Sequence, residues 1–226
     1  MHMATTDSVL RRTELRKFLT PPQVEDLQRM CRRLTRKPGS TIFRQGEPAG
    51  AVFVLLEGSV ELRARPPGRR AYRTLEVVGG GCTFGDEALF DADEYLFSAR
   101  TMEASRLISL DRDGFDELAL VRPDIAVGLA RCSGSCLTQT VRRSAILTQA
   151  PAEVGLQRLL HDLATSGGSP DGNGAVPVRV THAQLAGLLH LSRETVSRML
   201  SRLAANGEVQ VGRGVVRIPA ASIRRG

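Results

Sequence analysis

The segment that most constrains the fold is "VTHAQLAGLLHLSRETVSRMLSRLAANG", which contains two short amphipathic helical patterns in succession. Thr181 and Gln184 form a T-x-x-Q capping box at the start of the first pattern, and Ser192 is an N-cap for the second. His190 and Leu191 leave room for only a tight turn between them. The segment therefore predicts two helices that pack against each other across a sharp corner.

A β hairpin is predicted directly after these helices. The stretch "EVQVGRGVVRI" alternates around a Gly-Arg-Gly turn. Two helices joined by a tight turn and followed by a hairpin describe a winged helix-turn-helix. In that arrangement the second helix enters the major groove of DNA with its N-terminus first.

The second helix carries side chains that suit such a contact. Arg193, Glu194, Ser197 and Arg198 fall near its N-terminus, opposite its apolar side. Arginine can hold O6 and N7 of guanine in a bidentate contact, and glutamate can accept a hydrogen bond from N4 of cytosine. We therefore expect this helix to read base edges. A face that is charged only for solubility is the alternative.

The overall charge favours an anionic partner. The formal net charge is +7, with a net −7 over residues 84–124 and a net +4 over residues 150–226. Arginine accounts for 29 of the 31 basic residues, which suits phosphate and guanine, although a genome rich in G and C produces the same bias. No apolar run approaches the roughly 20 residues of a spanning helix, and the N-terminus lacks the pattern of a secretory signal. We expect a soluble, cytoplasmic protein without a membrane partner.

The region before the helical segment has a different periodicity. Stretches such as "STIFRQGEPAGAVFVLLEGSVELRAR" alternate short apolar runs with Gly and Pro turns, which is typical of an antiparallel barrel or jelly roll. From about Arg112 the pattern becomes helical, and Pro123 begins a long helix that could extend to about Gln149. The fold class is therefore α+β. The expected domains are a β-roll with N-terminal helices (1–121), a long helix and hinge (122–150) and a winged helix-turn-helix (151–226).

The long helix has two competing apolar stripes. One consists of Ile125, Leu129, Cys132 and Cys136. The other contains small residues that would let two helices approach closely, and consists of Ala130, Gly134, Leu137, Val141 and Ser144. We expect this helix to pair with its twin in a homodimer. A single amphipathic helix that lies on its own barrel is the alternative.

The chain resembles the CRP/FNR family of bacterial transcription regulators over nearly its whole length. "LSRETVSRML" resembles the recognition helix, "FRQGEPAGAVFVLLEGSVEL" the entry to the β-roll, "FGDEALF" the phosphate-binding cassette and "RPDI" the start of the dimerisation helix. The resemblance implies a homodimer with a cyclic-nucleotide-binding-like β-roll and a C-terminal winged helix. Its expected partners are double-stranded DNA and RNA polymerase.

The resemblance also implies roles for residues of the helix-turn-helix. Arg193 and Arg198 would contact guanines and Glu194 a cytosine, in TGTGA-like half-sites arranged as an inverted repeat. Contacts to DNA phosphates are expected from hydroxyls and amides near helix starts and from the wing. These residues are Thr181, Ser192, Thr195, Ser197 and Arg213.

The expected effector pocket departs from the family pattern. Its positions are Gly85, Asp86, Glu87, Phe97, Ser98 and Thr140. Phe97 stands where nucleotide-binding members of the family have an arginine, next to the expected Ser98. A buried phosphodiester anion needs a charge-assisted partner. We therefore expect no tight binding of cAMP, and keep as the alternative a regulator whose DNA binding requires a nucleotide or another small molecule.

The cysteines are the next candidates for a switch, with Cys132 favoured as the sensor. Cys132 and Cys136 lie one helical turn apart near the presumed dimer seam, where oxidation or nitrosylation would add bulk and polarity. Small buried apolar residues are the alternative. We expect no structural zinc, no iron–sulfur cluster (only Cys31 lies in the N-terminal region) and no haem on Cys82. No nucleophile–base pair, G-x-S-x-G or Walker motif is present, so we do not expect an enzyme.

Overall fold

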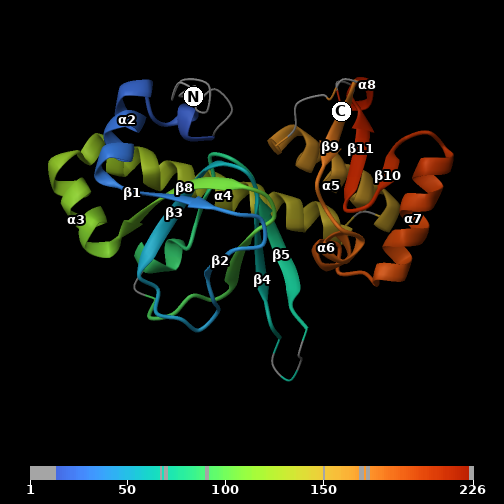
Figure 1. Ribbon diagram of the computed structural model, residues 1–226, viewed down its shortest axis with the longest axis horizontal. Helices are drawn as coiled ribbons and strands as arrows, with labels where there is room; N and C mark the ends of the chain where they lie inside the picture. Colours follow the sequence, from blue (N-terminus) through green and yellow to red (C-terminus); the bar gives the residue numbers. More distant parts are fainter. Residues whose placement is uncertain are drawn as a thin grey trace. The chain divides into compact units, whose positions relative to one another are not determined.

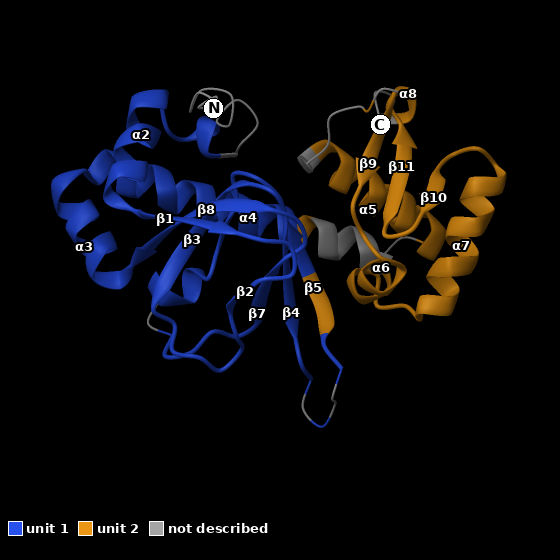
Figure 2. Cartoon of the chain, viewed as in Figure 1, with its two compact units in different colours: residues 1–72, 76–140 blue, residues 73–75, 141–226 orange. Residues whose placement is uncertain are grey.

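The structure, a computed structural model, describes residues 14–66, 68, 71–89, 92–149, 151–167, 171 and 174–223. The chain divides into two compact units, which Figure 2 shows in separate colours. Unit 1 comprises residues 1–72 and 76–140, and unit 2 comprises residues 73–75 and 141–226.

Unit 1 begins with the 3-10 helix η1 (Glu14–Lys17) and the helix α2 (Pro21–Met30). Helix α2 starts where the sequence predicts. Thr20 is its N-cap and Pro21 its first residue, and the backbone N–H of Thr20 donates to Gln23 Oε1 at 2.8 Å.

Two four-stranded sheets follow, with strand orders β1-β8-β3-β6 and β2-β7-β4-β5. Figure 1 labels β1, β3 and β8 of the first sheet and β2, β4 and β5 of the second. The strand pairs β1–β8, β3–β8, β3–β6, β2–β7 and β4–β7 are all antiparallel. The expected antiparallel β-roll is confirmed. The strands are β1 (Arg32–Arg36), β2 (Thr41–Phe43), β3 (Ala51–Glu57), β4 (Val60–Ala64), β5 (Arg73–Val78), β6 (Thr83–Phe84), β7 (Ser98–Thr101) and β8 (Ser105–Asp111).

Strands β3 and β8 separate two hydrophobic cores. Val54 pairs with Ile108, and both pack under the helices of unit 1. The next pair, Leu55 and Leu107, points to the other face of the sheet and into the interior of the roll. All four side chains are buried. The near-continuous apolar run of β3 follows from this burial on both faces.

Helix α3 (Arg112–Val121) and the long helix α4 (Pro123–Gln149) complete the helical layer. Asp111 caps α3 by accepting a hydrogen bond from Gly114 N at 2.9 Å. Helix α4 begins at the expected proline and ends at the expected Gln149. Gly128 lets α4 approach the N-terminal segment closely, because a Cβ there would lie 2.1 Å from Leu19 Cδ2.

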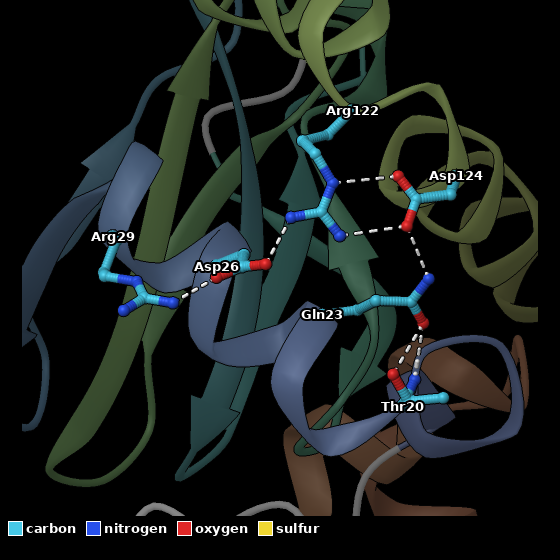
Figure 3. A network of polar contacts seen from close by, with 6 residues as sticks. All are labelled: Thr20, Gln23, Asp26, Arg29, Arg122 and Asp124. Atoms are coloured by element: carbon cyan, nitrogen blue, oxygen red, sulfur yellow. Dashed lines mark hydrogen bonds and ion pairs between the residues drawn. The ribbon is translucent and has the colours of Figure 1, made fainter.

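A polar network joins α2 to the start of α4 (Figure 3). Arg122, between α3 and α4, donates to Asp124 from Nε at 3.1 Å and from Nη2 at 3.0 Å, and its Nη1 donates to Asp26 of α2. Arg29 also pairs with Asp26, and Gln23 Nε2 donates to Asp124 at 2.7 Å. Hydrogen bonds from Arg122 lower the pKa of both Asp26 and Asp124, and the two carboxylates raise the pKa of Arg122.

Unit 2 is a small helical domain with a three-stranded sheet of order β10-β11-β9. Its buried core is aliphatic and includes Leu156, Leu159, Leu185, Val196 and Leu200. The elements are α5 (Ala152–Gly167), β9 (Ala175–Val178), α6 (His182–Leu188), α7 (Arg193–Ala205), β10 (Gln210–Gly212), β11 (Val215–Pro219) and α8 (Ala220–Ile223).

The predicted α+β class, with a β-roll, a long helix and a C-terminal winged helix-turn-helix, is confirmed. The division of the chain at residues 121 and 150 stays a prediction. Within the described part of the chain, no helix combines the length and apolar character needed to span a bilayer.

The network around Arg122 predicts a specific pH response. Because the pKa values of Asp26 and Asp124 are lowered, their contribution to stability is complete above the unfolded value of 3.8 and is lost as the pH falls through the lowered values. In Arg122→Met we expect a lower thermal midpoint at pH 7. We also expect a flatter decline of that midpoint between about pH 4 and pH 2. Calorimetry over a pH series measures both.

The matched control is Arg32→Met, which removes an exposed arginine of β1. The thermal midpoint of this variant should change with pH as that of the wild type does. If the Arg122 and Arg32 variants decline identically with pH, the network does not contribute.

Candidate nucleic-acid interface

The first helix of the candidate interface is fixed by its cap. Thr181 Oγ1 accepts a hydrogen bond from Gln184 N at 3.2 Å, and Thr181 N donates to Gln184 Oε1 at 2.9 Å. The predicted capping box is therefore present. Both side chains are used locally to define the start of α6, on the surface of unit 2.

The turn between the two helices has a left-handed residue. The backbone of His190 has φ of 55°, and its N–H donates to Gly187 O at 3.2 Å. Leu191 N then donates to Ala186 O at 2.9 Å. This pair of bonds is the Schellman pattern that usually places glycine at the left-handed position. Histidine therefore stands here at some conformational cost.

Helix α7 separates apolar from charged side chains. Ser192 caps it by accepting from Thr195 N at 3.1 Å. The three side chains expected to contact bases, Arg193, Glu194 and Arg198, are all exposed, with Arg193 at the first position of the helix. The apolar side packs into unit 2 and consists of Val196, Met199, Leu200 and Leu203.

The hydroxyls expected at DNA phosphates are already paired within the helix-turn-helix. Ser192 Oγ lies 2.9 Å from Thr195 Oγ1. Ser197 Oγ lies 2.8 Å from Nδ1 of His182, which connects α7 to the first residue of α6. Sequence reasoning missed this contact, because the two residues lie in different helices.

The wing is short and ends in a basic turn. Strands β10 and β11 pair from Gln210 with Arg217 to Gly212 with Val215. Arg213 and Gly214 form the exposed turn, in which Gly214 adopts φ of 71°. The predicted hairpin is confirmed.

The start of the cassette is tightly packed. Gly85 adopts φ of 74°, and a Cβ at this position would lie 3.1 Å from Ala51 O and 3.2 Å from the rings of Phe43 and Phe53. Only glycine can adopt this positive φ and fit this close packing without a shift of the neighbouring atoms. The carboxylate of Glu87, two residues later, is 3.4 Å from Leu96 N.

Asp86 faces hydroxyl groups of the cassette and of α4. Thr83 Oγ1 lies 3.3 Å from one carboxylate oxygen, and Ser133 of α4 lies 3.4 Å from the other. Burial raises the pKa of Asp86 to about 6, and the hydrogen bond from Thr83 acts in the opposite direction. The carboxyl that resembles the family's ribose contact is thus engaged with α4.

The second half of the cassette separates two neighbours onto opposite faces of β7. Phe97 is half-buried against the core of the roll, with its ring centroid 6.0 Å from that of Phe43. Ser98 is 1% exposed and accepts a hydrogen bond from Gln45 N at 3.0 Å. Thr140, expected beside the base of a nucleotide, donates to the carbonyl oxygen of Cys136 within its own helix at 3.1 Å.

Three of the four cysteines gather where β6 meets α4. Cys132 is fully buried and donates to Gly81 O at 3.2 Å. Hydrogen bonds from Cys132, then from Cys82, and from the backbone of Thr83 lower the pKa of Cys136. We call Cys82, Cys132 and Cys136 the thiol cluster. By contrast, burial raises the pKa of Cys31 to about 12.

The structure corrects one expectation about Cys132. Its side chain belongs to the stripe of α4 that packs on its own unit, with Ile125 and Leu129, and not to an intersubunit seam. Sequence spacing also missed Cys82 as a neighbour of Cys136, since the two residues lie in separate elements. Among the described residues, no group of histidine, cysteine and acidic side chains is arranged to hold a metal ion.

The other stripe of α4 is open. Leu137 is 65% exposed and Val141 58% exposed, and Ala130 and Gly134 of the same stripe are exposed as well. A Cβ at Gly134 would meet nothing within 4 Å. Ser144, expected on this stripe, lies outside the residues whose side chains are described. The two stripes thus differ in the structure: one is buried and one faces outward.

Comparison with known protein families gives two matches that together cover most of the chain. The cyclic nucleotide-binding domain matches residues 33–121, and the Crp-like helix-turn-helix domain matches residues 156–221.

Similar proteins include the "CRP-like cAMP-activated global transcriptional regulator" of Mycobacterium tuberculosis, which is 30% identical over 91% of this chain and 92% of its own length. The "Cyclic AMP receptor protein" of Thermus thermophilus is 32% identical with the same coverage. Among solved structures, a CRP/FNR-family transcriptional regulator from Thermus thermophilus is 26% identical, with a TM-score of 0.71 over 85% of this chain and 96% of its own.

A nucleotide-binding-type β-roll followed by a helix-turn-helix with a basic outer face defines a DNA-binding transcription regulator. The matches include residues of both units, and this extent assigns the chain to one family. The chain belongs to the CRP/FNR family of transcription regulators, as its resemblance implied.

The left-handed turn at His190 predicts a ranking of variants. A β-branched residue is poorly tolerated at positive φ, so His190→Val should reduce the free energy of unfolding of unit 2 by about 1–2 kcal/mol. His190→Gly relieves the turn but adds freedom to the unfolded chain, so its net effect should stay below about 1 kcal/mol. Urea denaturation, monitored through the hydrogen exchange of amides in α6 and α7, measures the free energy of unfolding of unit 2 in both variants. Equal losses in the two variants would contradict a strained turn.

Proposed function

We propose that the chain acts as a homodimer that reads inverted repeats of TGTGA-like half-sites in the major groove. Arg193 and Arg198 contact guanines, and Glu194 accepts a hydrogen bond from a cytosine. The observation that carries this proposal is that all three side chains are exposed near the N-terminus of α7, while the apolar side of the helix is buried. RNA polymerase is the further partner and the cytoplasm the location that this function entails.

Phosphate contacts would come from the rim of the same surface. Thr181 and Ser192 are the capping residues of α6 and α7, with Thr195 and Ser197 one turn further along α7. Backbone N–H groups at helix starts favour anions, and the hydroxyls can rotate toward phosphate oxygens. Arg213, exposed at the tip of the wing, would make a further phosphate contact.

The open stripe of α4 supports the homodimer. Ala130, Gly134, Leu137 and Val141 repeat at the spacing of a two-stranded coiled coil and have no cover within the described part of unit 1. Small residues at two of these positions would let a second copy of the helix approach closely. A symmetric pair of helices also suits an inverted repeat in DNA.

We further propose that the regulator does not bind cAMP tightly. A cyclic phosphate held in the cassette would need a cation, whereas Phe97 presents a ring and Asp86 is engaged with Thr83 and Ser133. The residues present therefore do not fit a buried phosphodiester. The alternative is a regulator that needs an effector in the roll. The names of the Mycobacterium tuberculosis and Thermus thermophilus relatives, which refer to cAMP, favour that alternative.

Control by cysteine oxidation or nitrosylation is the third part of the proposal. The thiol cluster lies between the cassette and α4, so a change of volume there would act on both. Cys136 is its reactive member, because it is half-exposed and its pKa is lowered. Cys132, its buried neighbour, is the other candidate thiol. With hydrogen peroxide as the oxidant, the Cys136 thiol would give a sulfenic acid and one water molecule.

The DNA-reading proposal predicts the effect of one truncation. We expect Arg193→Ala to weaken binding to an inverted TGTGA duplex by about 1–3 kcal/mol and to relax specificity at one base pair of each half-site. Fluorescence anisotropy with reduced protein at physiological salt, with a scrambled duplex as competitor, measures both effects.

The control variant is Arg158→Ala, which removes an exposed arginine of α5. It should bind both duplexes as the wild type does. Equal losses in the two variants would indicate a general charge effect and would contradict base reading. A duplex with one half-site should bind more weakly than the inverted repeat if the dimer reads DNA. Binding that appears only after cAMP is added would favour the alternative.

The thiol cluster predicts an order of reactivity. In the native protein, we expect iodoacetamide to label Cys136 first and Cys31 last, because the pKa of Cys136 is lowered and that of Cys31 is raised to about 12. Labelling of Cys136 should also persist below neutral pH. Mass spectrometry of timed samples measures each rate, and urea-unfolded protein is the control in which the order disappears. Labelling of Cys31 as fast as Cys136 would contradict the assignment.

A further inference from the structure

Strand β4 carries an arginine on the outer face of its sheet. Val60 and Leu62 of β4 are buried in the core of the roll, so Arg63 points to the opposite face. The strand register pairs Arg63 with Ser98 of β7, and the preceding pair, Leu62 with Ala99, faces the core. Arg63 therefore shares a face with Ser98 and not with Phe97, which packs on the core side.

A second arginine and a tyrosine complete this surface. The guanidinium carbon of Arg63 is 4.4 Å from the ring centroid of Tyr72, and that of Arg65 is 4.6 Å from the same centroid. One ring thus holds two cations near each other, each by a cation–π contact. The arrangement places two positive charges beside one aromatic ring, with Glu61, two residues before Arg63, on the same face of β4.

One side-chain nitrogen of Arg63 lacks a hydrogen-bond partner among the described residues. Its Nε is buried and has no hydrogen-bond partner in the part of the chain that the structure describes. Among these residues, no carboxylate forms an ion pair with Arg63 or Arg65. A buried donor without a partner is costly, and native structures usually supply one from a bound ion or water. Arg63 thus lacks an acceptor for Nε within the described part of the chain.

The neighbouring polar groups are already ordered. Ser98 Oγ accepts from Gln45 N at 3.0 Å, which leaves the hydroxyl proton of Ser98 to donate. Gln45 Oε1 in turn accepts from Arg65 N at 2.9 Å, so the backbone of Arg65 is fixed relative to the same loop. Ser98 is 1% exposed, beneath Arg63. These two bonds fix the loop of Gln45 and the backbone of Arg65 beside Ser98.

We propose that Arg63 and Arg65, held around Tyr72, bind the phosphate group of a small molecule on the outer face of the β2-β7-β4-β5 sheet. Phosphate oxygens match guanidinium groups in bidentate contacts, and an anion between the two arginines removes their mutual repulsion. The two arginines lie on the face of the sheet opposite the core on which Phe97 packs, and the cassette residue Ser98 is the strand partner of Arg63. Unit 1 would then bind a phosphate-bearing ligand although Phe97 stands where nucleotide-binding members of the family have an arginine.

The tyrosine content of the chain makes the site directly observable. The chain has no tryptophan and two tyrosines, Tyr72 at the site and Tyr95, which is 5% exposed inside the roll. Binding at the two arginines should change the emission of Tyr72 and leave that of Tyr95 nearly constant. We expect a saturable change when the full-length protein is titrated at constant ionic strength. Inorganic phosphate is one probe and ribose 5-phosphate, which does not absorb in this range, is the other.

Three variants locate the effect. Arg63→Gln and Arg65→Gln should each weaken binding at least about tenfold, because a charged hydrogen-bond partner is lost. Arg65 is exposed, so the second variant keeps the test valid if the first fails to fold. Arg33→Gln, which replaces an exposed arginine of β1, is the matched control and should bind as the wild type does.

Saturation by both probes would assign the site to the phosphate group itself, and saturation by ribose 5-phosphate alone would assign it to phosphate esters. Either result supports the proposal if the Arg63 and Arg65 variants each weaken the binding at least about tenfold. No saturable response to either probe at millimolar concentration, or a response that the three variants share, would overturn it. DNA binding is a separate measurement, so this test does not depend on the proposed regulator function.

Discussion

A helix with two apolar stripes can bury only one of them against its own chain, and α4 is such a helix. The stripe with Ile125 and Leu129 is buried in the helical core of unit 1. The stripe with Gly134 and Leu137 then has to face outward. The proposed homodimer, the location of Cys132 and the contact of Ser133 with the cassette all follow from this choice of face, because 3.6 residues per turn fix where every other side chain of α4 points.

The candidate interface also depends on a helix that buries one side and exposes another. Helix α7 buries its apolar side and leaves Arg193, Glu194 and Arg198 exposed. Caps at Thr181 and Ser192 fix where α6 and α7 begin. The charged side chains of α7 therefore lie at defined positions along the helix axis. Affinity for DNA in general needs only charge, whereas reading a sequence needs this positional order.

The parts of the fold that could be predicted from the sequence are those whose signals are local. The capping box of Thr181 and the turn at His190 each involve neighbours within a few residues, and both occur as predicted. The pairing of Cys136 with Cys82 could not be read from spacing, since β6 and α4 meet only after the roll has closed. Nor could the sequence decide which stripe of α4 is buried, because both are apolar. The base and phosphate contacts of α7 remain expectations, since DNA itself defines them.

The close approach of Gly128 to Leu19 has a mechanical consequence. A helix pinned by backbone proximity near one end behaves as a stiff rod with a fixed point, since its own hydrogen bonds resist bending. Gly128 lies five residues from the start of α4, and Thr140 lies about 18 Å further along the axis at 1.5 Å per residue. A small rotation about the fixed point would move the first turn very little and the far end in proportion to its distance. Ser133, which touches the cassette, lies between the two, so a rotation about Gly128 would displace Thr140 further than Ser133.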